Sequence, residues 1–271
     1  MRFSIVTIAF NQVDFIESAL LSVLGQDYPD LDYIVVDPGS TDGTRDIIER
    51  YRDRISTIIY RSDRGAAEGL NNGFAAATGD ILGFLNSDDL LLPGAIARVA
   101  RQFREQPEAD VVMGHMRIVD RDGRFVRNAY NDRFNARAYA YGACTICQQS
   151  TFFRATRFRE TRGFNLKNTI SWDSELFVDM LGARGKPAVI DDFLSAFRVY
   201  SDSITGGRGH MAAKRDFFEA RFQRILGRPW TRRDDLIRYL YLARKYLLQP
   251  RSLYQRLVHG PIVKRSITER F

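Results

Sequence analysis

The sequence has little cysteine and no long uncharged apolar run. Cys144 and Cys147 are the only cysteines in 271 residues, which excludes a disulfide scaffold and favours a reducing compartment. No apolar stretch approaches the ~20 residues that would cross a bilayer. The N-terminal apolar stretch is interrupted too soon, by Asn11 and Gln12, to be a secretory signal. We therefore expect a cytoplasmic protein.

Two common nucleotide-binding loops are also missing. The first predicted strand runs into AFNQVDF rather than G-x-G-x-x-G, and no P-loop occurs anywhere in the chain. These absences exclude nicotinamide-dependent enzymes and P-loop NTPases. The CxxC pair has no second cysteine pair to complete a four-ligand zinc site, and it lacks the βαβ setting of a thioredoxin. We expect neither role for it.

The basic residues are concentrated near the C-terminus. The formal net charge is +7, but from His210 onward fifteen Lys and Arg face five Asp and Glu, which leaves the first 209 residues at −3. The length suits one large α/β domain with an appendage. We predict a main domain over residues 1–209 and a basic helical extension over 210–271. No nucleic-acid-binding module accompanies the charge, so nucleic acid is not an expected partner.

Apolar strands alternate with amphipathic helices in the first ninety residues. The pattern predicts strands at 3–9, 33–36, 56–60 and 81–85. Such alternation is typical of an α/β fold with a mainly parallel sheet and helices on both faces, in which ligands bind at the carboxyl ends of the strands. Four polar residues follow these strands and should meet at one edge: Asn11, Asp37, Asp63 and Asp88.

The stretch LGFLNSDD delivers two adjacent carboxylates, Asp88 and Asp89, to that edge. Magnesium typically takes one or two carboxylates while substrate phosphates complete its shell, so the pair is a candidate metal site. The alternative is a helix cap before LLPGAIARVA, because Asp favours helix N-termini. Taken alone, the pair fits both interpretations.

Two longer segments resemble a known family. SIVTIAFNQVDFIESALLSVLGQDYPDLDYIVVDPGSTDGT, followed by GDILGFLNSDD, is similar to the family 2 glycosyltransferases of the GT-A fold, of the bacterial polysaccharide or cell-envelope type. The resemblance covers about residues 3 to 205. It implies a GT-A type, Rossmann-like sheet, with a nucleotide-sugar half over about 1–92 and an acceptor half over about 93–209.

The resemblance implies a nucleoside site at the first two strands. Ala9 and Asn11 fall where the family's first strand meets the base, and Asp37 falls beside the base and ribose. The family's usual Asp-Asp-Gly-Ser is here Asp37-Pro38-Gly39-Ser40. Pro38 offers neither a side-chain acceptor nor a backbone donor. The alternative for Asp37 is a turn residue that opens PGSTDGT.

The resemblance also implies the diphosphate contacts. Arg64 and Asn71 lie in the segment RSDRGAAEGLNNG, where Arg64 offers a guanidinium fork suited to phosphate, or is a solvated surface residue. The acidic pair would assign Asp88 to the ribose and Asp89 to Mg²⁺ or Mn²⁺. His210, in GGRGH, is a candidate additional metal ligand or a surface histidine.

On the acceptor side, GFNLKNTISWDSELFVDML is similar to a family segment that carries the catalytic base. The corresponding residue is Asp173, which would deprotonate the acceptor hydroxyl. Trp172 would stack on a sugar ring or belong to the core. CQQSTFFR resembles a stretch near the acceptor site, where Gln149 is the expected contact; a plain strand explains QQSTFF equally well.

The resemblance implies an inverting glycosyltransferase. The donor would be a nucleoside-diphosphate-sugar and the acceptor a hydroxyl of a glycan or lipid-linked molecule. A sugar nucleotidyltransferase is the enzymatic alternative, although its Gly-rich first loop is missing. A non-catalytic sugar-nucleotide-binding or scaffold protein is the other alternative, which the presence of Asp89 and Asp173 argues against.

The basic extension contains one amphipathic helix. DDLIRYLYLARKYLL places Leu236, Leu240, Ala243 and Leu247 on one helical face. Such a face either lies on an anionic membrane surface, at the inner side of the cell membrane, or packs onto the catalytic domain or another subunit. The sequence favours neither and leaves the oligomeric state open.

Overall fold

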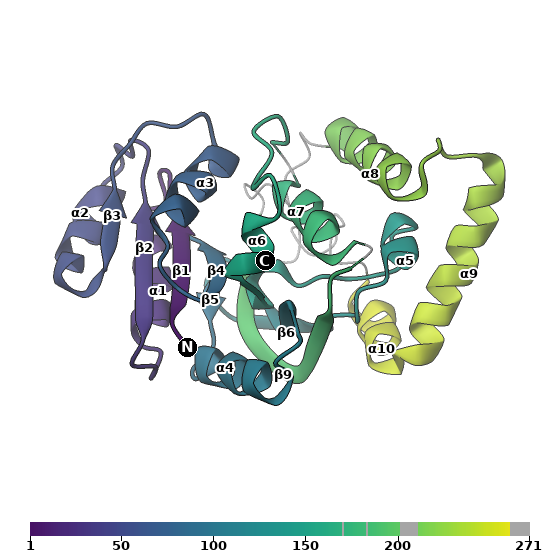
Figure 1. Cartoon of the computed structure of the whole chain (residues 1–271), viewed down its shortest axis with the longest axis horizontal. Coiled ribbons are helices and arrows are strands. Elements are labelled where there is room, and N and C mark those ends of the chain that lie inside the picture. Colours follow the sequence, from purple (N-terminus) through teal and green to yellow (C-terminus); the bar gives the residue numbers. More distant parts are fainter. Residues whose placement is uncertain (170, 183, 201–210, 261–271) are drawn as a thin grey trace.

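The structure is a computed structural model that describes residues 1–169, 171–182, 184–200 and 211–260. A nine-stranded sheet runs through it in the order β3-β2-β1-β4-β8-β6-β9-β5, with β7 paired to β6 (Figure 1). The strands are β1 (Phe3–Ile8), β2 (Leu31–Val36), β3 (Thr57–Ile59), β4 (Ile81–Asn86), β5 (Leu90–Leu91), β6 (Val111–Val119), β7 (Phe125–Ala129), β8 (Thr151–Arg154) and β9 (Pro187–Arg198).

The helices follow the strands in chain order. They are α1 (Ile16–Leu24), α2 (Thr44–Arg50), α3 (Ala66–Ala76), α4 (Ala95–Glu105), α5 (Ala136–Ala140), α6 (Ala155–Arg159), α7 (Trp172–Leu181), α8 (Met211–Leu226), α9 (Arg232–Leu248) and α10 (Pro250–His259). Two 3-10 turns are η1 (Arg52–Arg54) and η2 (Gln148–Ser150). Among the described helices, none combines the length and the apolar character that a membrane crossing requires.

The two halves of the sheet are paired differently. Strands β3, β2, β1 and β4 are all parallel, as the alternating β and α pattern predicts. Beyond β4 the pairing is mixed: β8 is antiparallel to both β4 and β6, whereas β9 runs parallel to β6. The α/β class and the helices on both faces are confirmed, and parallel pairing dominates only the first half.

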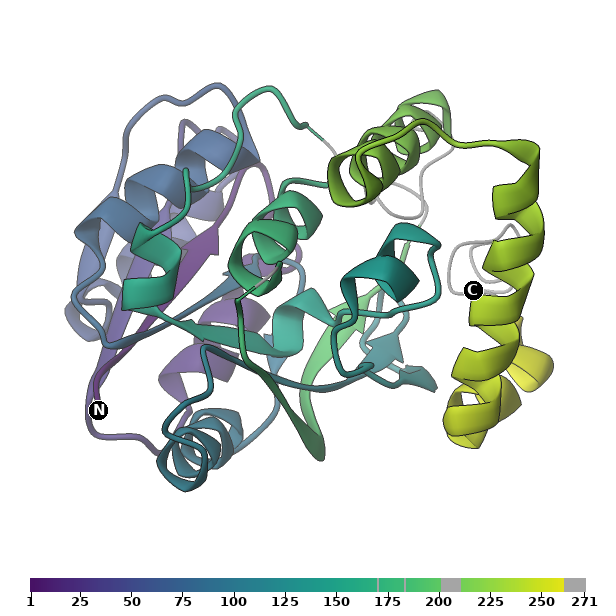
Figure 2. The same cartoon turned by 45° about the vertical axis from the view of Figure 1, so that its right-hand side comes forward.

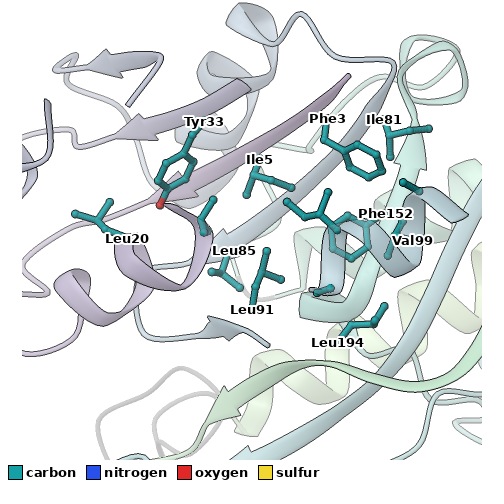
Figure 3. Packing of buried hydrophobic residues seen from close by; sticks show 14 of the residues in the cluster. Phe3, Ile5, Leu20, Tyr33, Ile81, Leu85, Leu91, Val99, Phe152 and Leu194 are labelled. Carbon is teal, nitrogen blue, oxygen red and sulfur yellow. The ribbon is translucent and has the colours of Figure 1, made fainter. Parts of the chain in front are cut away.

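Each face of the sheet packs against its own helices. Side chains of α1, α2 and α4 meet one face around Phe3, Ile5 and Val35 (Figure 3). Side chains of α3 and α7 meet the other face around Val6 and Phe84. Successive residues of β1 therefore point to opposite layers, as a strand's period of two requires. Both layers fix the positions at which the parallel strands end.

The C-terminal helices are packed against the main domain. Phe222 of α8 is fully buried with Tyr141, and Tyr141 stacks on Tyr241 of α9 at 5.0 Å between ring centroids. Gln255 of α10 accepts a hydrogen bond from the backbone N–H of Asn128 in β7. The described part of the predicted extension, residues 211–260, is thus mainly helical and in contact with the main domain (Figure 2).

Candidate active site

A cavity of about 720 Å³ opens at the carboxyl ends of β1 and β4. Parallel strands place their C-terminal loops at the same edge of a sheet, which is why residues distant in sequence meet here. The polar and acidic side chains in its wall come from six separate segments: Gln12, Ser62, Asp63, Asn86, Ser87, Asp88, Gln148, Gln149, Asp173 and Tyr200. Apolar wall is added by Ala9, Pro38, Trp172 and others.

The two adjacent carboxylates after β4 have different positions. Asp88 lines the cavity and accepts a hydrogen bond from the Tyr200 hydroxyl at 3.1 Å. Asp89 is fully buried and is not among the lining residues. One of its oxygens accepts from Gln149 Nε2 at 2.9 Å, and the other from the Arg198 backbone N–H at 3.0 Å. Asp88 lines the cavity, whereas Asp89 is buried and connects the segments that contain Gln149 and Arg198.

Burial changes the acidity of both groups. Desolvation raises the pKa of Asp88 above its ordinary value, partly offset by the hydrogen bond from Tyr200. Desolvation, together with the nearby Asp88, raises the pKa of Asp89 further. Two carboxyls this close in a buried place resist ionising together, so a cation in the cavity would favour the ionised form of Asp88.

Two amide oxygens in the cavity wall lack partners. Asn86 Oδ1 and Gln12 Oε1 are buried and accept no hydrogen bond from any described residue. An unsatisfied buried acceptor is costly, and a ligand donor or a cation would relieve the cost. Within the described part of the chain, no three His, Cys, Asp or Glu side chains cluster as a metal site. One carboxylate and one amide oxygen nonetheless suit a magnesium-type ion whose shell is completed by phosphates.

Asp173 contributes to the wall of this cavity from the first turn of α7. Its side chain is half-buried and lines the cavity. Desolvation raises its pKa, while a backbone N–H bond at Ser174 and the charge of Arg221 act in the lowering direction. A carboxylate with a raised pKa is a better proton acceptor, so Asp173 has the environment that a general base needs. The cavity therefore joins Asp88 and Asp173.

Asp37 is engaged within its own loop. It is fully buried, and its Oδ1 accepts from the backbone N–H groups of Gly39 and Ser40 and from Arg45 Nε at 2.9 Å. These bonds to the following backbone N–H groups are those of a turn residue, so the turn interpretation accounts for one of the two carboxylate oxygens. The other, Oδ2, is buried and without a partner among described residues. Pro38, next along the chain, contributes directly to the cavity wall.

Asn11 shapes the neighbouring loop. Its φ of 51° is positive, which no other non-glycine residue in the described part of the chain adopts. Its Oδ1 accepts from the Thr41 N–H, and its own N–H donates to Ser40 Oγ. Asn11 thus ties the end of β1 to the loop after β2. Ala9, two residues earlier, lies in the cavity wall.

Arg64 and Asn71 have partners within the protein. Arg64 is 76% exposed at its side chain and pairs with Glu68, with 2.9 Å between Nε and Oε2. Asn71 accepts from the N–H of Phe164 at 2.9 Å and donates to its carbonyl at 2.8 Å. Neither residue is among those that line the cavity. Asn71 instead clamps α3 to the loop before α7.

Sequence reasoning missed three side chains of the wall. Asn86 stands within the quoted motif LGFLNSDD, and Gln12 adjoins Asn11, so both were within reach of motif analysis. Tyr200 meets Asp88 across 112 residues, and no local pattern announces that contact. His210 lies outside the described residues. Cys144 and Cys147 are buried free thiols.

Comparison with known proteins identifies the family. The sequence profile described as Glycosyl transferase family 2 matches residues 4–164, more than half of the chain. An uncharacterized glycosyltransferase of Nostoc sp. is 33% identical over 133 residues, which cover 48% of this chain and 41% of that protein. Chondroitin synthase of Escherichia coli is 29% identical over 178 residues, covering 64% of this chain and 26% of the synthase. The chain spans less than half the length of these relatives.

Solved structures share the fold at low sequence identity. Staphylococcus aureus TarS 1-349 in complex with UDP-GlcNAc superposes with a TM-score of 0.66 at 17% identity, covering 96% of this chain and 74% of that one. Mannosyltransferase PcManGT of Pyrobaculum calidifontis, in complex with GDP-Man and Mn2+, has a TM-score of 0.62 at 17% identity, covering 96% of this chain and 76% of that one. At this identity the likeness concerns the fold.

Proposed function

The chain belongs to glycosyl transferase family 2, and from this premise we propose that it transfers a sugar, with inversion, from a nucleoside-diphosphate donor to an acceptor hydroxyl. The observation that carries the proposal is a single cavity that contains both Asp88 and Asp173. One carboxylate would serve the donor diphosphate and the other the acceptor. Relatives such as the putative teichuronic acid biosynthesis glycosyltransferase TuaG of Bacillus subtilis support an acceptor in cell-envelope glycan synthesis.

The donor would lie against the ends of β1 and β4. Solved relatives were crystallised with UDP-GlcNAc and with GDP-Man and Mn2+, which supports a nucleotide-sugar here. Sequence similarity alone gives the cation to Asp89. The geometry favours Asp88, because Asp89 has both oxygens engaged by Gln149 and Arg198. We therefore propose that Asp88 and Asn86 Oδ1 hold Mg²⁺ or Mn²⁺, with Asp89 positioning them.

For the other residues predicted to contact the donor, we propose roles that fit their positions in the structure. Ala9 would lie against the base, where the cavity wall includes it. The unpartnered Oδ2 of Asp37 is a buried acceptor suited to a base N–H. Asn11 would act by shaping the loop, and Asn71 by holding α3. Arg64 would contact a phosphate only after its hydrogen bond to Glu68 breaks.

The transfer itself is a single displacement. Asp173 accepts the proton of the acceptor hydroxyl as that oxygen attacks the anomeric carbon of the donor sugar. The bond between the anomeric carbon and the phosphate oxygen breaks, and the nucleoside diphosphate leaves. A bound divalent cation would neutralise charge on the departing diphosphate. A positioned base contributes ~10² to 10⁴-fold to such a rate.

The acceptor would approach along a second cavity. This cavity, of about 450 Å³, lies between the 165–169 loop, α7 and α8, and includes Asn165, Lys167 and Phe217. It shares α7 with the first cavity, and the charge of Arg221 in its wall acts on Asp173. Amides, a lysine and an aromatic ring suit a polar glycan chain. On this proposal α8 belongs to the acceptor site.

The proposal can be tested by separating donor binding from transfer. A panel of nucleotide sugars is screened, with Mg²⁺ or Mn²⁺, for a rise in melting temperature and for release of nucleoside diphosphate. With the donor so identified, we expect Asp88→Ala to weaken cation-dependent donor binding. We expect Asp173→Asn to bind donor normally and to lose transfer by ~10² to 10⁴-fold.

Asp53→Asn is the matched control, because Asp53 is an exposed carboxylate in η1 that is not among the residues lining the cavity. It should behave like the native protein in both assays. Native transfer rates in both Asp88→Ala and Asp173→Asn would refute the site assignment. No stabilisation by any nucleotide sugar would refute the proposed donor class.

A further inference from the structure

Helices α9 and α10 carry an exposed apolar surface. In α9, Leu236, Tyr239, Leu240 and Leu247 recur at helical spacing on one side, and their exposed fractions range from 62% to 82%. In α10, three large side chains at spacing of three and four are also exposed: Tyr254, Leu257 and Val258. We call these seven residues the apolar stripe. Exposed apolar side chains at such spacing mark an interaction site.

The opposite side of α9 already contacts the main domain. Tyr241 stacks on Tyr141, and Lys245 forms an ion pair with Asp132 at 2.9 Å and donates to Thr145 Oγ1. The sequence left two uses open for an apolar face on this helix. Contact with the main domain is made by the other side of α9, and the residues of the apolar stripe are exposed within the described chain.

Arginines flank the apolar stripe. Arg232, Arg233 and Arg244 are exposed, and at helical spacing they fall beside the row that contains Leu236 and Leu240. Among the described residues, none of the three arginines forms an ion pair. Together α9 and α10 contain seven Arg and Lys against two Asp. On a membrane surface, long basic side chains of this kind place their charges among the lipid headgroups. The apolar side chains beside them then reach the boundary between headgroups and acyl chains.

One of the two acidic residues is exposed. Asp234 is buried and paired with Arg228. Asp235 is exposed and accepts from Trp230 Nε1 at 3.3 Å. In a two-fold dimer through the apolar stripe, the three arginines of each copy would face those of the other, and Asp235 is the one exposed carboxylate on α9 and α10 that could offset them. Such repulsion disfavours a second copy as the occupant.

We propose that the apolar stripe and its arginines dock this protein on an anionic lipid surface. The helices lie in the plane of the interface, with leucine and tyrosine side chains in the headgroup and acyl boundary. Electrostatic attraction to anionic lipid supplies the rest of the affinity. The proposal does not depend on the proposed function, because it concerns a surface separate from both cavities.

The test is co-sedimentation of the full-length protein with lipid vesicles. We expect binding to vesicles of phosphatidylglycerol and phosphatidylethanolamine, weakened by salt, and little binding to phosphatidylcholine vesicles. Leu247→Glu should lower the partition coefficient by at least about tenfold, because a large exposed leucine no longer enters the lipid. Arg233→Gln should lower it by about fivefold on anionic vesicles only.

Leu21→Glu is the matched control, since Leu21 is an exposed leucine on α1, remote from α9 and α10 in the fold (Figure 1). It should bind vesicles like the native protein. Melting temperatures of all variants establish that they remain folded, and nucleotide-sugar hydrolysis should be unchanged in Leu247→Glu. Equal binding to both vesicle types would overturn the proposal. So would a concentration-dependent dimer that Leu247→Glu abolishes, because a second copy would then cover the surface.

Discussion

At the scale of single residues, two neighbouring aspartates perform different tasks. Asp88 and Asp89 are equivalent as letters, and the motif resemblance assigned the cation to Asp89. Their positions depend on partners more than a hundred residues away, Arg198 and Tyr200. Local sequence could predict that an acidic pair reaches the sheet edge. Local sequence could not predict which of the two aspartates lines the cavity and which is buried, because that depends on tertiary hydrogen bonds.

The buried role of Asp89 predicts a stability defect. In Asp89→Asn, one carboxylate oxygen becomes an NH₂ group that faces either the Gln149 amide donor or the Arg198 N–H. Two donors then oppose each other in a buried place, so we expect a loss of about 1–3 kcal/mol in the free energy of unfolding. Denaturant titration measures this. Asp53→Asn should unfold like the native protein, and an equally stable Asp89→Asn would contradict the fastening role.

The cysteines give a second prediction at this scale. Burial raises the pKa of Cys144 to about 11 and that of Cys147 to about 12. The reactive species is the thiolate, so both thiols should resist alkylation at pH 8 in the folded protein and react once denaturant is added. Mass spectrometry after iodoacetamide treatment distinguishes the two states. Rapid labelling of either thiol in the folded protein would revive a redox or metal role for the CxxC pair.

At the scale of elements, the first half of the fold was predictable and the second half was not. Buried strands and amphipathic helices up to β4 follow each other at short range, so periodicity marks them. In the second half, the sequence pattern indicates short strands near 111–119 and a helix over roughly 173–183, where the structure has β6 and α7. The pattern also indicates a strand near 188–190, which is far shorter than β9, because β9 reaches Arg198 by pairing with β6. Long-range pairing extends strands beyond what a local pattern indicates.

Helix α3 also depends on a contact that the sequence does not announce. Asn71 makes both backbone hydrogen bonds of Phe164, so Asn71→Ala should cost about 1–3 kcal/mol in the free energy of unfolding. Asn72→Ala, at the next position of the same helix, is the matched control for helix propensity. Thermal unfolding of both variants makes the comparison. Equal melting temperatures would show that the clamp contributes nothing.

At the scale of the whole molecule, the C-terminal helices are held to the body through a buried acidic residue. Asp234 accepts from Arg228 and from the hydroxyls of Tyr141 and Thr231, and so joins α9 to the α8–α9 turn and to the main domain. The bonds from Arg228, chiefly, hold the pKa of Asp234 below its ordinary value. Net charge along the sequence predicted a basic helical extension and left open whether it packs onto the main domain, because composition does not reveal such a junction.

This depressed pKa predicts a pH dependence of stability. A carboxyl whose folded-state pKa is lowered stabilises the fold above its unfolded value, near 3.8, and that contribution is lost as the pH falls further. We expect Asp234→Asn to melt below the native protein at pH 7, with the difference narrowing as the pH drops under 3.8. Scanning calorimetry across this range provides the measurement. Arg228→Met should reproduce the pattern, and a difference that is constant with pH would contradict it.

The buried carboxylate of Asp89 has a wider mechanical consequence. One of its oxygens holds η2 and the other holds β9, while its backbone follows β4. Asp89 therefore holds three distant stretches of chain together at one point. We expect this part of the cavity wall to move little when a ligand binds. If the proposed transfer takes place here, we expect the loops around the cavity to select the reactants, so exchanging those loops between relatives should change sugar or acceptor preference.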